Sequence, residues 1–176
     1  PVLNGRFLRV QVGFVDPSVP ATTSIVDLNA HLDYTTSTQP QATRDMALGD
    51  PRGIVWNSAG TTAYVSGMGS NNLVVIDDSG ARSGAAPTIE VGAGPTGLAI
   101  DDVAGVLYVL NKFDGSISVV DLGTELETAR VPFFDPSPAA IKNGRKHLYD
   151  THKNSGLGHV SCGSCPGVRS MSWSRN

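Results

Sequence analysis

The sequence predicts an all-β protein built from repeated antiparallel sheets, because of an internal repeat, strand-like content and composition. The repeat has a spacing of 44 residues and runs without a gap. Its six identities pair Pro51, Gly53, Tyr64, Val65, Val75 and Asp77 with Pro95, Gly97, Tyr108, Val109, Val119 and Asp121. With 20 glycines, 11 prolines and 16% charged residues, the composition favours a turn-rich β protein over a helical bundle. A period of about 40–45 residues with strand content is typical of a β-propeller blade.

The first two strands belong to a degenerate copy of this unit. Residues 7–14 (FLRVQVGF) predict a strand, and residues 24–28 (SIVDL) parallel residues 118–122 (SVVDL). A polar insertion over residues 34–44 displaces the period before Pro51. The chain therefore contains about two and a half copies of the unit.

The two later copies predict the other strands. The first covers residues 53–56, 61–66, 73–77 and 88–91, and the second covers residues 96–100, 106–110 and 116–121. Asp114 and Gly115 predict a two-residue hairpin turn, because both can adopt positive φ. Asp27, Asp77 and Asp121 end strands, so we expect their carboxylates to accept hydrogen bonds from the following turn rather than to act in catalysis.

In a propeller, the first strand of each blade lies beside a central axis. Gly53 and Gly97 belong to these first strands, so we expect them where backbones crowd together. Propellers close with about four to eight blades, so residues 1–131 predict a partial β-propeller of two to three four-stranded antiparallel blades. Such a fragment exposes blade faces. Its expected partners are the remaining propeller blades or another protein chain.

The second complete copy carries a family resemblance. Residues 95–100 (PTGLAI), 107–111 (LYVLN) and 115–121 (GSISVVD) resemble the YVTN-type β-propeller repeat, and residues 64–67 (YVSG) are a looser copy. The resemblance covers residues 49–131 well and residues 7–32 poorly. It implies a periplasmic or secreted bacterial protein, because members of that family are typically surface, binding or accessory modules. It also implies a domain without catalytic residues of its own.

The strand-like pattern ends at residue 131, and residues 132–176 predict a linker, a short helix and an irregular tail. Ser137 and Pro138 predict the start of the helix, as its N-cap and first residue. Residues 139–150 then predict a helix with Ile141, Leu148 and Tyr149 on one face. The sequence therefore predicts two parts, residues 1–131 as propeller blades and residues 132–176 as a truncated segment of another kind.

That second segment also carries a resemblance. Residues 144–149 (GRKHLY), followed by Cys162-Gly163-Ser164-Cys165, resemble the entrance to a c-type cytochrome domain of the di-haem peroxidase-like kind. The resemblance implies that Cys162 and Cys165 attach haem covalently and that a His directly after them ligates iron. Position 166 is Pro, which offers no iron ligand. We therefore expect a vestigial haem attachment site, with no cofactor in this chain and haem c in the parent family.

Other roles for the cysteines and their neighbours are weaker predictions. A redox dithiol is disfavoured because no βαβ pattern surrounds the pair, and a zinc site is disfavoured because a second pair of ligands is missing. His147, His152 and His159 lie in a polar, glycine-rich segment, where we expect solvent-exposed histidines. No metal ligand and no catalytic residue is predicted.

Charge and hydropathy exclude two classes of partner. The net charge is −3 and no run of Lys and Arg exceeds two residues, so nucleic acid is not an expected partner. No stretch approaches the about 18 apolar residues of a membrane-spanning helix. The sequence predicts a non-catalytic propeller scaffold for binding or interaction. The alternative is the propeller portion of a c-type cytochrome that transfers electrons or reduces peroxide, so the enzyme class of the parent protein stays open.

Overall fold

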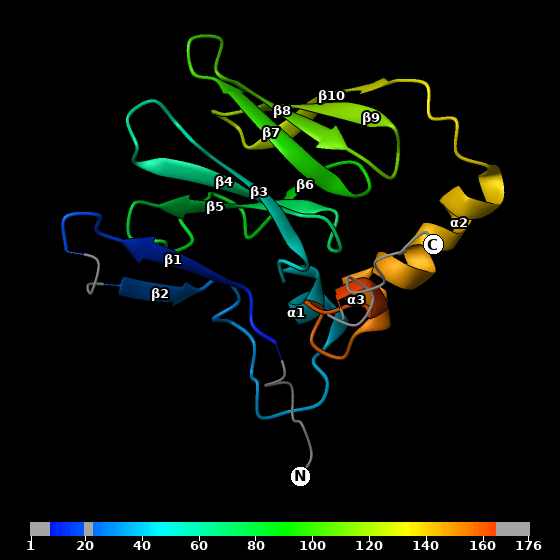
Figure 1. Ribbon diagram of the computed structural model, residues 1–176, viewed down its shortest axis with the longest axis horizontal. Coiled ribbons are helices and arrows are strands. Elements are labelled where there is room, and N and C mark those ends of the chain that lie inside the picture. Colours follow the sequence, from blue (N-terminus) through cyan, green and yellow to red (C-terminus); the bar gives the residue numbers. More distant parts are fainter. Residues whose placement is uncertain (1–7, 20–22, 165–176) are drawn as a thin grey trace, which may run out of the picture.

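The computed structural model describes residues 8–19 and 23–164, and it is mostly β, with three antiparallel sheets and few helices. Figure 1 shows the sheets following one another through the molecule in chain order, with β1 and β2 at one end and β7–β10 at the other. The all-β prediction is confirmed at this level. No helix of the described residues is long and apolar enough to cross a membrane.

The first sheet has two strands, β1 (Gln11–Val15) and β2 (Thr23–Asp27). β1 begins later than the predicted strand at residues 7–14, because Val10 turns into the core at 2% exposure. The Val10 carbonyl still accepts the Leu28 N–H at 2.8 Å. The predicted polar insertion contains a short helix, α1 (Gln41–Asp45), which the sequence analysis did not anticipate.

The two complete copies of the repeat form two four-stranded sheets. The β3–β6 sheet consists of β3 (Pro51–Trp56), β4 (Thr62–Gly67), β5 (Asn72–Asp77) and β6 (Ile89–Glu90) in that order. The β7–β10 sheet consists of β7 (Pro95–Asp101), β8 (Val106–Asn111), β9 (Ser116–Asp121) and β10 (Leu126–Pro132) in the same order. Strands that are adjacent in the chain pair in both.

The two sheets also share their register. Tyr64 lies opposite Val55 and Val75, and Tyr108 lies opposite the equivalent Ala99 and Val119. Each sheet has an irregularity at its first strand, between Pro51 and Gly53 and between Pro95 and Gly97. The 44-residue repeat of the sequence is thus a repeat of strand order and pairing.

The fourth strands of the two sheets differ in length, because in the β3–β6 sheet residues 83–88 do not form a strand and the chain pairs with β5 again only at β6. β6 has two residues and β10 has seven. Position 82, which corresponds to the first residue of β10, is an arginine in the earlier copy. Arg82 donates to the Leu28 carbonyl at 2.6 Å, to the Met46 carbonyl at 2.8 Å and to Asn29 Oδ1 at 2.8 Å. These bonds tie residue 82 to the N-terminal part of the molecule.

The hairpin between β8 and β9 corrects the two-residue turn predicted at Asp114 and Gly115. The loop covers residues 112–115, and of the two predicted residues only Gly115 has positive φ, at 64°. Asn111 ends β8, and its side-chain Nδ2 donates to Ser118 Oγ at 2.7 Å and to Ser116 Oγ at 3.1 Å. The Gly115 N–H closes the loop on the Asn111 carbonyl at 3.0 Å.

The core lies between the sheets. One cluster joins Tyr64, Leu73 and Val75 of the β3–β6 sheet to Leu107 and Val109 of the β7–β10 sheet. A second cluster packs the opposite face of the β3–β6 sheet, at Ala63, Val65, Val74 and Ile76, against Val10, Leu28 and Leu48. The β3–β6 sheet is therefore covered on both faces.

Two helices follow β10. The predicted helix is present as α2 (Ala139–Tyr149), but Pro138 rather than Ser137 is its N-cap, and it has no side-chain capping bond. The Ser137 hydroxyl instead accepts a hydrogen bond from Arg145 Nη2 at 2.8 Å. This bond holds Ser137 to the side of the helix, so it cannot cap the first turn.

The chain then returns to its N-terminal part through α3 (Thr151–Asn154). The Thr151 N–H donates to the Gly69 carbonyl at 2.8 Å, and Arg44 Nη1 donates to the Ser155 carbonyl at 3.0 Å. Ideal Cβ atoms on Gly49 and Gly69 would lie 2.2 Å and 2.6 Å from the Thr151 side chain. Glycine at both positions makes room for Thr151, so residues 151–159 pack as part of the main body.

Candidate interaction face and cysteine segment

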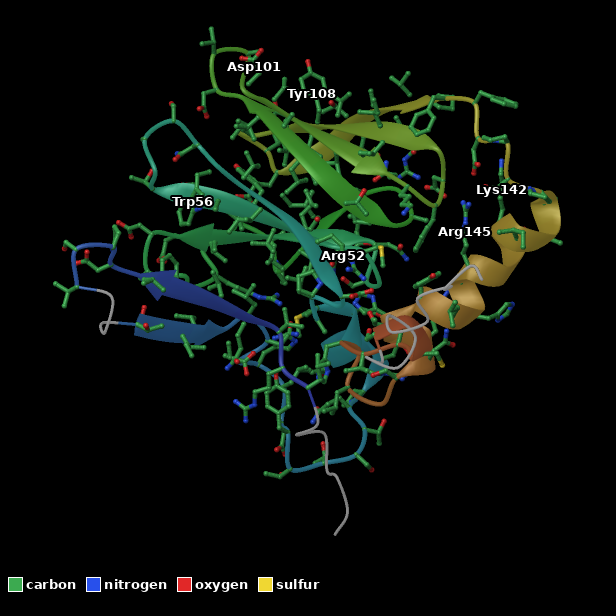
Figure 2. All side chains as sticks on the ribbon, viewed as in Figure 1. Arg52, Trp56, Asp101, Tyr108, Lys142 and Arg145 are labelled. Atoms are coloured by element: carbon green, nitrogen blue, oxygen red, sulfur yellow. The ribbon has the colours of Figure 1, made fainter. Side chains whose placement is uncertain are left out.

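The outer face of the β7–β10 sheet is apolar over most of its area and ends at two aspartates. By strand alternation and register its apolar part consists of Gly97, Ala99, Tyr108, Leu110, Ile117, Val119, Ala129 and Val131, and the same face reaches Asp101 and Asp121 at the strand ends. Tyr108 is 42% exposed, Leu110 41% and Ile117 37%. Figure 2 shows Tyr108 on the side of this sheet that faces away from the rest of the molecule. An apolar patch that spans four strands is typical of a surface that binds another protein.

The same face of the β3–β6 sheet is covered. Tyr64 and Leu73, which correspond to Tyr108 and Ile117, are 5% and 0% exposed. They pack against Leu107, Val109 and the other inward side chains of the β7–β10 sheet. The difference in exposure therefore comes from the neighbour, since the two sheets have the same strand order and register.

At the junction between the β3–β6 and β7–β10 sheets, the backbones of β3 and β7 approach each other closely at Gly53. A Cβ on Gly53 would lie 2.5 Å from the Thr96 carbonyl oxygen, so only glycine leaves room for β7 there. The Gly53 N–H donates to Ser66 Oγ at 2.9 Å, and the Ser66 hydroxyl faces the Thr96 carbonyl at 3.5 Å. Gly97 has space by contrast, because its nearest neighbour would be Leu110 Cβ at 3.4 Å. Crowding is thus found at the first of the two predicted glycines and is absent at the second.

Polar contacts at the rim also join these two sheets. Asp102 Oδ2 accepts the Ser58 N–H at 2.7 Å, and Glu125 Oε2 accepts the Ala85 N–H at 2.7 Å. Asn71 Oδ1 accepts the Gly94 N–H at 2.9 Å. Each contact satisfies a loop amide of one sheet with a side chain of the other, so the junction combines an apolar centre with a hydrogen-bonded rim.

The aspartates at the strand ends are structural, as predicted. Asp27 Oδ1 accepts the Asn29 N–H at 2.8 Å. Asp77 Oδ1 accepts the Ser79 hydroxyl at 2.6 Å and N–H at 2.9 Å, and these bonds hold the pKa of its carboxyl below the usual value. Asp121 accepts the Thr124 hydroxyl and N–H, both at 2.8 Å, which lowers its pKa in the same way. In each aspartate, Oδ1 accepts the bonds of the following turn, which is the structural role expected for it.

The cysteine segment begins beside α2. Cys162 is exposed and opens a short 3-10 helix (Cys162–Ser164), in which Ser164 Oγ accepts the Ser161 N–H at 3.1 Å. Gly163 lies against the Tyr149 ring, where a Cβ would approach to 2.6 Å. Cys165 and Pro166 lie outside the described residues. The vestigial haem attachment site predicted at Cys162 and Cys165 therefore stays a prediction.

The prediction of exposed histidines near the cysteines is wrong for His159. Its ring is 2% exposed, its Nε2 contacts the Leu8 carbonyl at 2.8 Å, and it packs edge-on to Tyr34 with ring centroids 5.7 Å apart. Burial lowers the pKa of His159. His152 is half-buried and contacts the Ala47 carbonyl at 2.9 Å. Within residues 8–19 and 23–164, no group of three His, Cys, Asp or Glu side chains is placed to hold a metal.

A cavity of about 210 Å³ between α2 and the sheet loops was not predicted. Its lining includes Phe113 and Tyr149, whose ring centroids are 4.8 Å apart, and the basic side chains Lys142 and Arg145. Figure 2 shows both basic side chains on α2. Arg145 Nη1 donates to the Phe113 carbonyl at 2.8 Å and to Asp135 Oδ2 at 3.2 Å, and Lys142 pairs with Asp135 at 3.5 Å.

The polar groups that line this cavity mainly attach α2 to the β8–β9 loop and to Asp135. Hydrogen bonds from Ser137, with further contributions from Arg145 and Lys142, hold the pKa of Asp135 well below its usual value, so the carboxylate stays ionised between the two cations. The sequence held no signal for it, because Phe113 and Arg145 meet only when α2 packs against the loop between β8 and β9.

Comparisons with known proteins assign no family. No protein-family model matches the sequence, and no curated protein matches it significantly. Among solved structures, hydrazine synthase of Kuenenia stuttgartiensis is similar over 50% of this chain, with 25% sequence identity and a TM-score of 0.46. The similar part is 24% of that chain, so this protein spans about a quarter of its length.

Proposed function

We propose that this protein is a non-catalytic β-propeller segment that serves as a binding or interaction scaffold in an extracytoplasmic protein. The observation that carries the proposal is the repetition of one sheet, with the same strand order and register, at a spacing of 44 residues. The first strands β3 and β7 contact each other, as the inner strands of neighbouring blades would. A scaffold of this kind acts through the faces and loops that it presents.

The polar side chains of the two repeated sheets support a scaffold role. Asp77 and Asp121 bind turn amides, while Asp102 and Glu125 join one sheet to the next. The exposed apolar outer face of the β7–β10 sheet is the surface that we propose for recognition. Its partners in this proposal are the remaining propeller blades or another protein chain. The periplasmic or secreted location follows from the resemblance to YVTN-type repeats.

The second candidate is the propeller portion of a c-type cytochrome of the peroxidase-like kind. Its support is the placement of exposed Cys162 beside α2, the helix that contains the GRKHLY block. The nearby histidines give it little support, however. His159 is buried against Tyr34 and the Leu8 carbonyl, and His152 contacts the Ala47 carbonyl. His147 is exposed on α2, but the residue after Cys165, where the resemblance expects the iron-ligating His, is Pro. We therefore derive no chemistry through haem for this chain.

Export of the full chain into a bacterial periplasm with a haem-maturation system separates the two candidates. The scaffold proposal predicts no covalent haem absorbance after denaturation and no peroxide reduction. The matched variants insert a His between Cys165 and Pro166, or replace both cysteines by Ser. Covalent haem on the unmodified chain, absent from the double Cys→Ser variant, would reject the scaffold proposal and favour the cytochrome.

A further inference from the structure

We propose that His159 is an acid-sensitive latch: its neutral ring holds residues 155–161 against the N-terminal part of the molecule, and protonation of the ring releases them. This role does not depend on the proposed scaffold function, because it concerns a different part of the chain. Figure 1 shows α3 beside α1, so the segment that follows α3 starts within the N-terminal part.

The ring of His159 joins two segments that are far apart in the sequence. Its Nε2 lies 2.8 Å from the Leu8 carbonyl oxygen, so Nε2 carries the hydrogen and donates it. The ring is 2% exposed and packs edge-on to Tyr34. Within residues 8–19 and 23–164, no group forms a hydrogen bond with Nδ1. A proton added at Nδ1 would therefore place a positive charge in a buried position without a partner.

The charges around the ring do not compensate for its burial. Burial lowers the pKa of His159 more than the Leu8 carbonyl, the Asp27 carboxylate and the Leu157 carbonyl raise it. Asp27 is already paired, because Arg9 Nη1 lies 3.3 Å from its Oδ2. The elements packed around the ring also carry His31, Asp33, Arg44, Asp45 and Arg82. None of these side chains affects the pKa of His159 as much as burial does.

The segment that the latch holds can open without unfolding the sheets. Residues 155–161 form neither a helix nor a strand. Their contacts with the N-terminal part include two further hydrogen bonds, from the Gln39 N–H to the Gly156 carbonyl at 2.8 Å and from Arg44 Nη1 to the Ser155 carbonyl at 3.0 Å. A segment without a regular hydrogen-bond ladder opens locally at a lower free energy than the core. Opening would expose the apolar cluster of Leu32, Tyr34, Ala47 and Leu157.

The sign of the pH dependence follows from the lowered pKa. In the open segment the ring has the ordinary pKa of about 6.5, and in the closed segment its pKa is lower. The latch is therefore fully formed above about pH 6.5 and weakens as the pH falls towards the closed-state value. Between about pH 7.5 and about pH 5.5, the open fraction should rise about tenfold while the closed ring stays neutral.

The test measures this opening in the full chain with both native cysteines replaced by Ser. Leu157→Cys, at a position that is 4% exposed, reports opening through its rate of reaction with dithiodipyridine. Dividing the rate in urea by the rate in buffer at the same pH gives a protection factor that is free of the thiol's own pH dependence. We expect this factor to fall about tenfold from about pH 7.5 to about pH 5.5. Val109→Cys, at a buried position of the β7–β10 sheet, should keep its protection, because the opening is local.

Two matched variants identify the group that titrates. His159→Gln keeps an amide that can donate to the Leu8 carbonyl but cannot take up a proton, so the protection of Leu157→Cys should no longer depend on pH. His31→Gln removes another partly buried histidine with a lowered pKa and should keep the tenfold change. An unchanged pH dependence in His159→Gln would overturn the proposal. So would constant protection in the parent chain, or an equal loss of protection at Val109→Cys.

A direct titration covers the case in which His159→Gln opens the segment at every pH. The ring protons of the four histidines are followed by NMR in the unsubstituted chain, and variants of the other three assign the signal of His159. We expect His159 to titrate below the value of about 6.5 that is measured for an unfolded chain. A pKa at or above the unfolded value would overturn the latch. These measurements require neither haem nor a binding partner, so their failure would leave the scaffold proposal untouched.

Discussion

Tyr64 and Tyr108 occupy the same place in two sheets of the same register, yet they are 5% and 42% exposed. Among the residues that the structure describes, the β3–β6 sheet lies between two neighbours, whereas the β7–β10 sheet has a neighbour on one face only. Residues that act within one sheet, such as Asp77 and Asp121, keep the same bonds in both. Side chains that pack between sheets, such as Tyr64, are buried only where a neighbouring sheet covers them. Covering of the face, rather than the repeat itself, therefore decides how much each position stabilises the fold.

The largest expected effect on stability is at Leu73 and Ile117, which lie at the centre of the two equivalent sheet faces. Leu73 and Ile117 are equivalent, but Leu73 is 0% exposed and Ile117 is 37% exposed. Leu73→Ala should lower the free energy of unfolding by about 2–5 kcal/mol, because it leaves a cavity between two packed sheets. Ile117→Ala should cost about 1 kcal/mol or less. Urea denaturation of the two variants measures both, and equal losses would mean that the outer face is covered in solution.

A smaller effect is expected at the two glycines. Gly53→Ala places a methyl group 2.5 Å from the Thr96 carbonyl and should destabilise the chain by about 1–3 kcal/mol. Gly97→Ala meets only Leu110 Cβ at 3.4 Å, so its change should lie within about 0.5 kcal/mol of zero. Thermal unfolding of the pair gives the difference. A large loss at Gly97 would show an obstacle that this structure lacks.

The smallest expected effect concerns the strand-end aspartates, where the two sheets should agree. The folded pKa values of Asp77 and Asp121 are both lowered, first by side-chain hydroxyl bonds, so their contribution is present above the unfolded pKa of about 4 and is lost as pH falls through the folded value. Asp77→Asn and Asp121→Asn should each weaken the loss of stability on acidification, and by similar amounts. Unfolding free energies measured from neutral to acidic pH test this. A clear difference would mean that a neighbouring sheet also affects the turns.

Much of the fold could be predicted because its signals are local. The repeated Gly, Tyr and Asp positions fall on strands and turns, so the 44-residue spacing already locates the first three strands of each four-stranded sheet. β10 (Leu126–Pro132) was not assigned from the sequence. The packing of Thr151 against Gly49 and Gly69 and the burial of His159 could not be predicted. They depend on Gly49, Gly69 and the Leu8 carbonyl, which are far away in the sequence and near only after folding.

The candidate face could be predicted only in part. Tyr108 and Val109 alternate between two apolar faces, and alternation alone does not say which face has a neighbour. In the folded chain Val109 is buried and Tyr108 is exposed. For Cys162 the sequence provided a motif, and the structure adds only its exposure and its position beside α2.

The packing of Thr151 against Gly49 and Gly69 also affects the order in which parts of the chain fold during synthesis. Gly49 and Gly69 form a notch that stays empty until residue 151 has been made, about 100 residues after Gly49. At about 5–20 residues per second, the wait is on the order of ten seconds, and the exit tunnel of the ribosome lengthens it. The sheets can pair during this time, but the loops that precede β3 can close only when the tail arrives. The segment around Gly49 and Gly69 therefore reaches its final form only after residue 151 has been made.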